Sequence, residues 1–174
     1  SNATISTAGA TVIQQRQNLG KTRVAGIQTD VEYRLGAAWK ISGGYVYNRA
    51  RVTENPSNPA VIGKFLPQVP RHRGTVQVSF THPKYANVTV DVLAIGSQFD
   101  DDLNARVVPG YTHPGLPEYG VVSLSVSRAF GPRLQVFFGV QNLLAQQYFV
   151  GTLPTTVGSP RLVSGGVRVR LTGR

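Results

Sequence analysis

Side chains alternate between apolar and polar over most of this chain. In each of several stretches, the apolar positions share one parity and the polar positions share the other. A period of two is typical of β-strands with one apolar and one polar face, and no stretch of useful length has the period of an α-helix. The sequence therefore predicts an all-β chain of about eight strands, near residues 11–17, 25–35, 39–47, 74–80, 88–94, 122–126, 134–140 and 163–171.

The connections between these strands alternate between short and long. Short turns are expected near 36–38, 82–84 and 131–133, and long polar loops with Pro and Gly at about 53–70, 100–118 and 143–160. Outer-membrane barrels have short turns on the periplasmic side and long loops on the outside. The rhythm predicts an antiparallel up-and-down meander that is part of an outer-membrane β-barrel or closes as one.

Strand length and aromatic positions agree with a membrane strand. From Trp39 to Tyr47 a tilted strand rises roughly 20 Å, which nearly spans the apolar band of such barrels, about 25 Å tall. Aromatic residues at strand ends predict two interface belts. The expected members are Tyr33, Trp39, Phe80, Tyr85 and Phe130 by the short turns, and Phe99, Tyr119 and Tyr148 by the long loops.

Arg49 and Arg51 continue the apolar face of their strand just beyond the expected hydrocarbon. Two interpretations are open for them. They contact the phosphates of lipopolysaccharide, or they are an ordinary solvated strand end. The sequence favours the second.

The amino-acid composition excludes several classes of protein. The chain has no Cys, which excludes a disulfide framework and Cys-based zinc sites, and no apolar run of about 18 residues that would form a membrane helix. It also has no Met, so we expect an excised or processed piece. Residues 1–3, Ser1-Asn2-Ala3, are interpreted as the remnant of an affinity tag, and residues 4–174 as a single-domain fragment.

The chain is strongly basic, with 18 Lys and Arg against 8 Asp and Glu and a formal charge of +10. This balance favours an anionic partner. Nucleic acid is not expected, because the arginines are scattered over strand ends and loops and do not interleave with aromatics in one module. Outer-membrane lipid and lipopolysaccharide are the expected surroundings.

The sequence contains no pattern that predicts catalysis. It has no Ser-His-Asp order, no phosphate-binding Gly loop and no carboxylate pair suited to acid/base chemistry, so we expect neither an enzyme nor a cofactor. A metal site is not expected either. The run Asp100, Asp101 and Asp102 is the weak candidate, as a calcium loop, although an ordinary solvated loop is the favoured interpretation.

One stretch resembles the penultimate strand of TonB-dependent outer-membrane receptors. In Val140 to Tyr148, the pair Asn142-Leu143 is followed by Tyr148, as in that family. Three more stretches agree with the family in the same order along the chain. They are Asn18-Leu19-Gly20 before Gly26-Ile27-Gln28, then Leu66 to His72, and finally Gly158-Ser159-Pro160-Arg161 leading into Gly165 to Arg170.

The resemblance implies that this chain is the C-terminal part of a barrel of about 22 strands whose lumen is blocked by a plug. The plug, the segment that contacts TonB and the earlier strands would be missing here. Such receptors lie in the outer membrane of Gram-negative bacteria and take up ferric siderophores, cobalamin, sugars or other metal chelates. Four arginines on the predicted polar face would line the lumen against the plug or an anionic ligand, or simply hydrate it; they are Arg34, Arg73, Arg168 and Arg170.

Two other readings of the pattern stay open. One is a self-contained eight-stranded outer-membrane barrel with a structural or adhesive role, and the other is a soluble β-sandwich binding module. For a receptor fragment, unpaired sheet edges and an uncovered apolar face predict that the isolated piece self-associates in plain buffer.

Overall fold

The computed structural model describes residues 2–8, 11–16 and 20–171, and nearly all its regular structure is β. One 3-10 turn, η1 (Pro59–Val61), is the exception. No helix in these ranges is long and apolar enough to cross a membrane. The strands are β1 (Asn2–Ala8), β2 (Thr11–Arg16), β3 (Lys21–Leu35), β4 (Trp39–Glu54), β5 (His72–Thr81), β6 (Asn87–Ile95), β7 (Tyr119–Phe130), β8 (Leu134–Gln141), β9 (Phe149–Thr152), β10 (Thr155–Val157) and β11 (Leu162–Val169).

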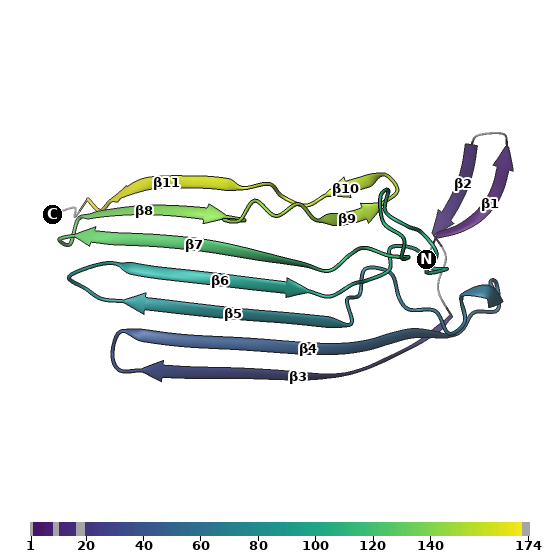
Figure 1. The fold of residues 1–174 in the computed structure, drawn as a ribbon, viewed down its shortest axis with the longest axis horizontal. Helices are drawn as coiled ribbons and strands as arrows, with labels where there is room; N and C mark the ends of the chain where they lie inside the picture. The colour runs from purple at the N-terminus through teal and green to yellow at the C-terminus, as the bar shows by residue number, and fades with distance from the viewer. Residues whose placement is uncertain (1, 9–10, 17–19, 172–174) are drawn as a thin grey trace.

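Seven of these strands form one antiparallel sheet, in the order β11-β8-β7-β6-β5-β4-β3 (Figure 1). The all-β meander predicted from the sequence is therefore confirmed. The sheet is not closed: β3 and β11 are its edges, and each pairs with one neighbour among the described strands. An open edge has unpaired backbone N–H and C=O groups that need another strand.

The eighth predicted strand does not join this sheet. Its described part is β2, which pairs with β1, and Gln17 lies outside the described residues. β1 was not predicted, and its first residues, Asn2 and Ala3, were interpreted as part of a tag remnant. Ser1 lies outside the described residues. The described strands thus do not form a closed eight-stranded barrel.

The short and long connections alternate as predicted. Residues 36–38, 82–86 and 131–133 make the short turns, and residues 55–71, 96–118 and 142–161 make the long connections at the opposite end (Figure 1). Two short turns use a glycine with positive φ, Gly36 at 63° and Gly131 at 69°, a conformation that costs a residue with a Cβ extra energy. The long connection 142–161 contains the small β9-β10 hairpin, which the sequence did not predict.

The strand register keeps apolar and polar residues on opposite faces of the sheet. Apolar positions face one another across strands, and so do the polar positions between them. One row of the apolar face is Ile41, Val78, Val90 and Leu124, and one row of the polar face is Ser42, Gln77, Asp91 and Ser123. This pairing is the two-faced wall that the alternation predicted.

The apolar face is uncovered within the described residues. Ile27 and Val31 in β3 are 68% and 63% exposed. A β-sandwich would bury such side chains against a second sheet, and no second sheet lies on this face in the part of the chain that the structure describes. The face is therefore available to lipid.

Burial is concentrated at the loop end of the sheet. Val61, Val108 and Leu116, which all lie in the long connections, are at most 1% exposed. The other buried apolar residues lie toward the loop ends of their strands: Ala50, Val52, Ile95 and Val140. The core among the described residues is thus shared between the long connections and the loop ends of the strands that they join.

Aromatic residues lie at the short-turn end where a belt was predicted, and at the loop end the apolar face has a different set from the one predicted. Their role as membrane-interface belts stays a prediction. Trp39 and Phe80 lie 4.9 Å apart, centroid to centroid, at the short-turn end. At the loop end the apolar face has Tyr45, Tyr47 and His72, with the Tyr45 hydroxyl 2.7 Å from His72 Nδ1. Three residues expected in that belt instead pack on other rings, Phe99 on Phe65 and Tyr119 on Tyr148. Parity places an aromatic residue on a face only inside a strand, and these three lie at strand starts or in loops.

Candidate functional site

The polar face of the sheet is hollowed. A cavity of about 570 Å³ runs along it from β3 to β7. Its polar lining residues are Asp30, Glu32, Ser42, Thr75, Gln77, Asp91 and Ser123. In a barrel, this face would border the lumen.

Carboxylates, rather than arginines, occupy the middle of this hollow. Asp30 accepts a hydrogen bond from Gln28 Nε2 at 3.0 Å, and Asp91 accepts one from Gln77 Nε2 at 2.7 Å. Only basic residues were predicted from the sequence to line the lumen. The same period-two pattern places Asp30, Glu32 and Asp91 on the polar face, so parity was the signal that would have found them.

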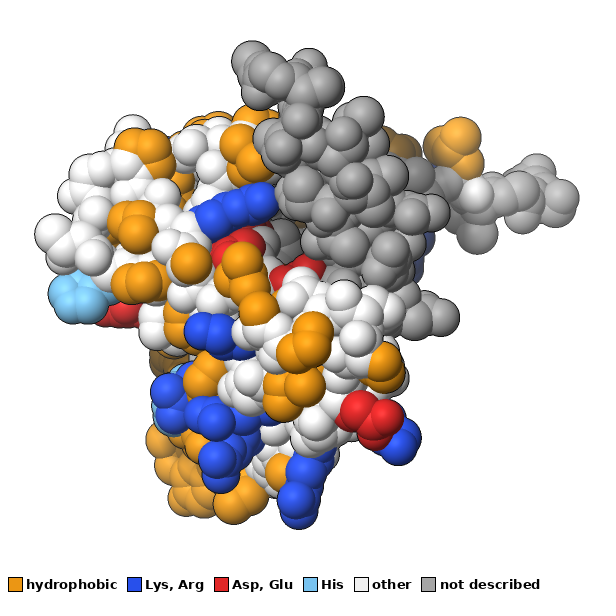
Figure 2. Space-filling model, turned by 90° about the vertical axis from the view of Figure 1, so that its right-hand side faces the viewer, with side chains coloured by type: hydrophobic (Ala, Val, Ile, Leu, Met, Phe, Trp, Pro, Cys, Tyr) orange, Lys and Arg blue, Asp and Glu red, His pale blue; other side chains and the backbone are white. Residues whose placement is uncertain are grey.

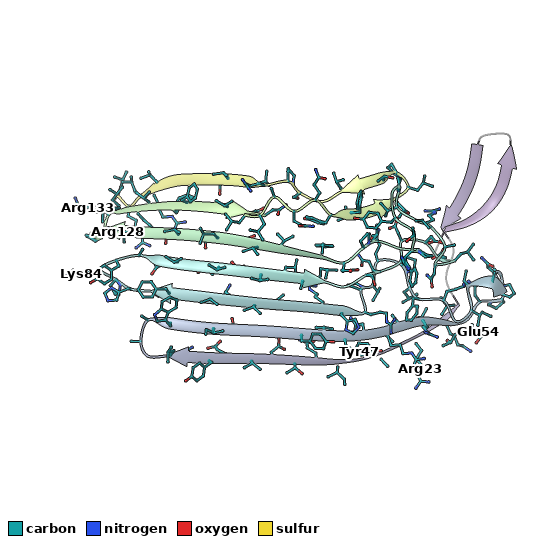
Figure 3. The ribbon with its side chains drawn as sticks, in the orientation of Figure 1. Arg23, Tyr47, Glu54, Lys84, Arg128 and Arg133 are labelled. Carbon is teal, nitrogen blue, oxygen red and sulfur yellow. The ribbon has the colours of Figure 1, made fainter. Side chains whose placement is uncertain are left out.

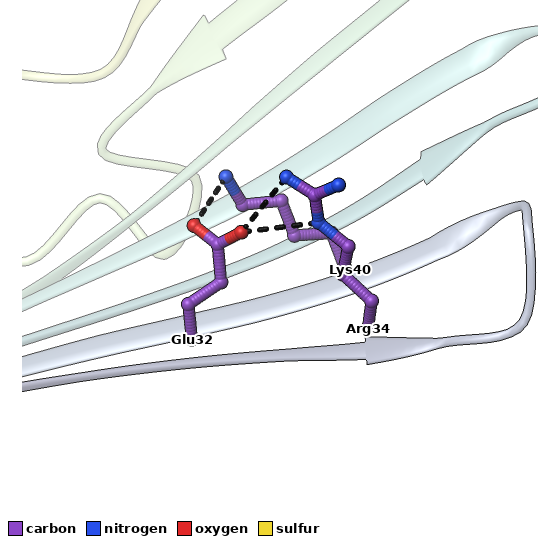
Figure 4. Close-up of polar contacts among 3 residues, drawn as sticks. All are labelled: Glu32, Arg34 and Lys40. Atoms are coloured by element: carbon purple, nitrogen blue, oxygen red, sulfur yellow. Dashed lines mark hydrogen bonds and ion pairs between the residues drawn. The ribbon is translucent and has the colours of Figure 1, made fainter.

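Arg34 is held at the short-turn end by an ion pair (Figure 4). The Glu32 carboxylate lies 3.1 Å from Arg34 Nη2 and 2.7 Å from Lys40 Nζ, across the β3-β4 hairpin. All three side chains are at least 41% exposed, so the pairs contribute little to stability. They do fix the position of Arg34 on the polar face.

The four candidate lumen arginines are not brought together. Arg34 and Arg168 lie toward the short-turn end, on the two edge strands β3 and β11. Arg170 lies at the same end, where its backbone N–H donates to the carbonyl of Arg133 at 2.8 Å. Arg73 is at the loop end, opposite Ile95. Contact of these arginines with a plug or a ligand stays a prediction.

Asp100 joins the three long connections. Its carboxylate accepts hydrogen bonds from Gln68 Nε2 at 2.9 Å and from the Thr152 N–H and hydroxyl at 2.6 and 2.7 Å. Partial burial raises the pKa of this carboxyl, but these hydrogen bonds and the charge of Arg106 outweigh it and hold the pKa below its usual value. The ionised carboxylate therefore stabilises the packing of the loops.

Asp101 has a structural role inside its own loop. Its carboxylate accepts hydrogen bonds from the backbone N–H groups of Leu103, Ala105 and Arg106, at 3.0 to 3.2 Å. A carboxylate engaged in this way is less available to a cation. No group of three or more His, Cys, Asp or Glu suited to a metal ion is found in the described ranges, which include Asp100, Asp101 and Asp102. Asp100 and Asp101 therefore stabilise the loops, and a calcium site at this run stays a prediction.

The residues of the resemblance motif meet in the loop between β8 and β11. Asn142 is 2% exposed and has a positive φ of 51°. Its amide nitrogen donates to the carbonyls of Gln146 and Ser159 at 2.9 and 3.1 Å, and its oxygen accepts the Gln146 N–H at 2.9 Å. The carbonyl of Tyr148 accepts the Gly158 N–H at 2.7 Å. The motif thus specifies how this connection folds, while Pro160 and Arg161 are exposed.

Arg73, Tyr119 and Tyr148 form a candidate ligand surface at the loop end. The register puts Arg73, Ile95 and Tyr119 in one row across β5, β6 and β7. The rings of Tyr119 and Tyr148 are stacked, with centroids 4.2 Å apart. An arginine beside stacked phenols can bind a planar anionic ligand by charge, hydrogen bonds and ring contact. The contact between these two tyrosines was not predictable from the sequence, because Tyr148 is 29 positions from Tyr119.

The sequence matches a known family, and the fold matches solved structures. The family described as TonB dependent receptor-like, beta-barrel, matches residues 1–143. The unliganded ferric citrate transporter FecA is 26% identical, with a TM-score of 0.71 over 84% of this chain and 24% of its own. The ferric yersiniabactin uptake receptor FyuA from Yersinia pestis is 16% identical, with a TM-score of 0.70 over 85% of this chain and 23% of its own.

The copper transporter OprC is also similar, at 17% identity and a TM-score of 0.65 over 85% of this chain and 23% of its own. These three chains are therefore about four times as long as the part that is matched. At these identities FyuA and OprC support the fold alone. The present chain spans about a quarter of the length of the solved structures that it resembles.

Proposed function

Because this chain belongs to the TonB dependent receptor-like β-barrel family, we propose that it forms the C-terminal strands of an outer-membrane receptor that imports a scarce nutrient such as a ferric siderophore. The receptor lies in the outer membrane of a Gram-negative bacterium and acts in transport, without catalysis. Residues 4–174 are its barrel segment.

The observation that carries this proposal is the two-faced seven-stranded sheet with long connections at one end only. A wall with an uncovered apolar face and a hollow polar face suits a strand array between lipid and an aqueous lumen. The open edges at β3 and β11 support pairing with further strands of a larger barrel. The same edges and the uncovered face lead us to expect self-association of the isolated chain.

The proposed receptor has parts beyond this segment. A plug fills the lumen against the polar face, and TonB supplies energy through a segment before the barrel. This chain contributes a stretch of lumen wall and three ligand-facing loops. The packing among the loops, through Asp100 and Asn104, supports a preformed ligand surface.

The ligand we propose is an anionic metal chelate. The chain is basic overall, and at the loop end Arg73 lies in the same row as Tyr119, which stacks on Tyr148. Ferric catecholates and ferric carboxylates carry negative charge, and catecholates add planar rings, so these two classes of chelate suit this surface. The similarity to a ferric citrate transporter adds support for that class of ligand.

Uptake of labelled iron by the complete receptor tests this function. We expect that a Gram-negative strain without other siderophore receptors gains uptake of at least one of a set of ferric catecholates, hydroxamates and carboxylates, and that uptake needs TonB. Arg73→Gln should raise the half-saturation concentration roughly tenfold, because it removes one charge-assisted contact. The matched variant Arg168→Gln, at the short-turn end, should leave it unchanged. Uptake of none of these chelates, or uptake without TonB, would contradict the proposal.

A further inference from the structure

Three arginines gather on the apolar face of the sheet at its loop end. In the register, Arg23 of β3 faces Arg51 of β4, and Arg49 faces Ala25 one row below. The three arginines line a half-open pocket, and the loop residues Ile62 and Gly63 form part of its wall. Arg23 and Arg49 are exposed, and Arg51 is half-buried. We refer to Arg23, Arg49 and Arg51 with this wall as the arginine pocket.

The charge of the arginine pocket is not neutralised by any carboxylate among the described residues. The ion pairs in those residues join Lys21 to Glu54, and Glu32 to Arg34 and Lys40. Glu54, the nearest acidic residue along β4, is engaged by Lys21. Arg51 Nε is buried and has no hydrogen-bond partner. Three neighbouring guanidinium groups repel one another, so an anion between them would be strongly favoured.

The position of the pocket next to the apolar face indicates that its ligand is an anion with an apolar part. Directly below it the same face has Ile27 opposite Tyr47, followed by Val31 and Ile41. From the Trp39 row to the Arg49 row is ten residues, which in a tilted strand corresponds to about 25 Å, the height of the apolar band of a barrel. Figure 3 shows Arg23 near the loop end of β3 and Lys84 and Arg128 at the opposite end. The arginines therefore lie at the level of lipid headgroups.

Seen from the loop end, Lys and Arg side chains gather in the lower part of the molecule, where β3 and β4 end, with hydrophobic side chains beside them (Figure 2). Basic and apolar surfaces in contact suit a ligand with a charged head and apolar chains. A free anion would make no contact with the apolar face. A strand end that was simply solvated would not require the loop residues that form the wall of the pocket.

We infer that the arginine pocket binds the phosphate groups of a phosphorylated glycolipid of the outer leaflet, the class that includes lipopolysaccharide. Guanidinium groups bind phosphate oxygens in pairs of hydrogen bonds, and three of them match a headgroup with more than one phosphate. The acyl chains then lie along Ile27, Val31 and Ile41, while Ile62, 48% exposed, covers the sugar-proximal end. The orientation of the strands in the membrane rests on the proposed function.

Binding of lipid A to the complete receptor in detergent tests this inference. The double variant Arg23→Gln/Arg49→Gln keeps Arg51, because its guanidinium packs 4.2 Å over the Phe65 ring and supports the loop. We expect roughly 30-fold weaker binding of lipid A, from the loss of two arginines near the membrane surface. The matched double variant Lys84→Gln/Arg128→Gln removes the same charge at the short-turn end and should bind like the unaltered receptor.

Two further probes separate the sources of phosphate. Lipid A stripped of its phosphates should bind the unaltered receptor as weakly as phosphorylated lipid A binds the double variant. Inorganic phosphate at millimolar concentration should not displace the lipid. Equal binding by both double variants, equal binding of both lipids, or displacement by inorganic phosphate would overturn the inference. Iron uptake by the Arg23→Gln/Arg49→Gln receptor reports separately on the proposed function, since these side chains face away from the lumen.

Discussion

Arginine at position 122 is expected to destabilise the folded receptor by about 2–4 kcal/mol, the cost of a basic side chain at the middle of the lipid-facing surface of a barrel. Val122 lies on the apolar face of β7, opposite Val92. Its row, which continues through Val76 to Gly43, lies halfway between the rows of Trp39 and Tyr47. A cation there has neither water nor a carboxylate within reach on that face.

The neighbouring residue provides the control. Ser123 faces Asp91 across the register and lines the hollow of the polar face. Arginine at position 123 would project into water beside a carboxylate, so Ser123→Arg should change the free energy of unfolding by less than 1 kcal/mol. Urea unfolding of the complete receptor in lipid vesicles measures both variants. Equal destabilisation by Val122→Arg and Ser123→Arg would show that the two faces do not differ in environment.

Alanine at position 142 should lower the free energy of unfolding by about 3 kcal/mol. The change removes the three hydrogen bonds of a side chain that is 2% exposed and leaves the Gln146 N–H and the Ser159 carbonyl without partners. It also puts a residue with a Cβ but no local hydrogen bond at a φ of 51°. Both effects loosen the connection between β8 and β11.

Urea unfolding with hydrogen exchange at Gln146 measures this effect. The Gln146 amide should lose its protection in Asn142→Ala, because its acceptor is the Asn142 side-chain oxygen. Asn87→Ala, at an exposed position at the start of β6, is the control and should cost under 0.5 kcal/mol. A similar decrease in the free energy of unfolding for both variants would show that the Asn142 side chain does not stabilise this loop.

The strands of the sheet were predictable because each has one face toward lipid and one toward water. Because of that contrast, apolar and polar residues alternate along each strand, and the alternation is clearest in β3 and β4. The short turns were predictable for a related reason, since Gly36 and Gly131 interrupt the alternation where the chain reverses. Register follows from the same pattern, because a shift of one residue would exchange the two faces.

The loops were not predictable in this way, because their contacts join residues far apart in the chain. Asp100 holds Gln68 and Thr152, which lie 32 and 52 positions away. From sequence alone, a run of aspartates in a polar loop suggests solvent or calcium, and nothing local indicates that their acceptors are already occupied. The stack of Tyr119 on Tyr148 was missed for the same reason, although both residues were noted as aromatic.

The alternation in the sequence predicted only part of the arginine pocket. The alternation placed Arg49 and Arg51 on the apolar face, and the register confirms that face. From sequence alone an ordinary solvated strand end was the favoured interpretation of both. Arg23 entered the group only through the pairing of β3 with β4, and Ile62 only through the folding of a loop. The pairing of β3 with β4 places Arg23 beside Arg49 and Arg51, and the three together form the charged pocket.

The proposed membrane wall requires that successive side chains along each strand face lipid and water in turn. Because this chain has no Cys, single cysteines can be introduced into it to measure this alternation directly. Single cysteines at each position from 121 to 126 of the complete receptor, spin-labelled in lipid vesicles, report collisions with oxygen from the lipid and with a nickel complex from water. We predict that oxygen dominates at 122, 124 and 126 and nickel at 121, 123 and 125. Uniform accessibility along β7, or the reverse alternation, would contradict the account.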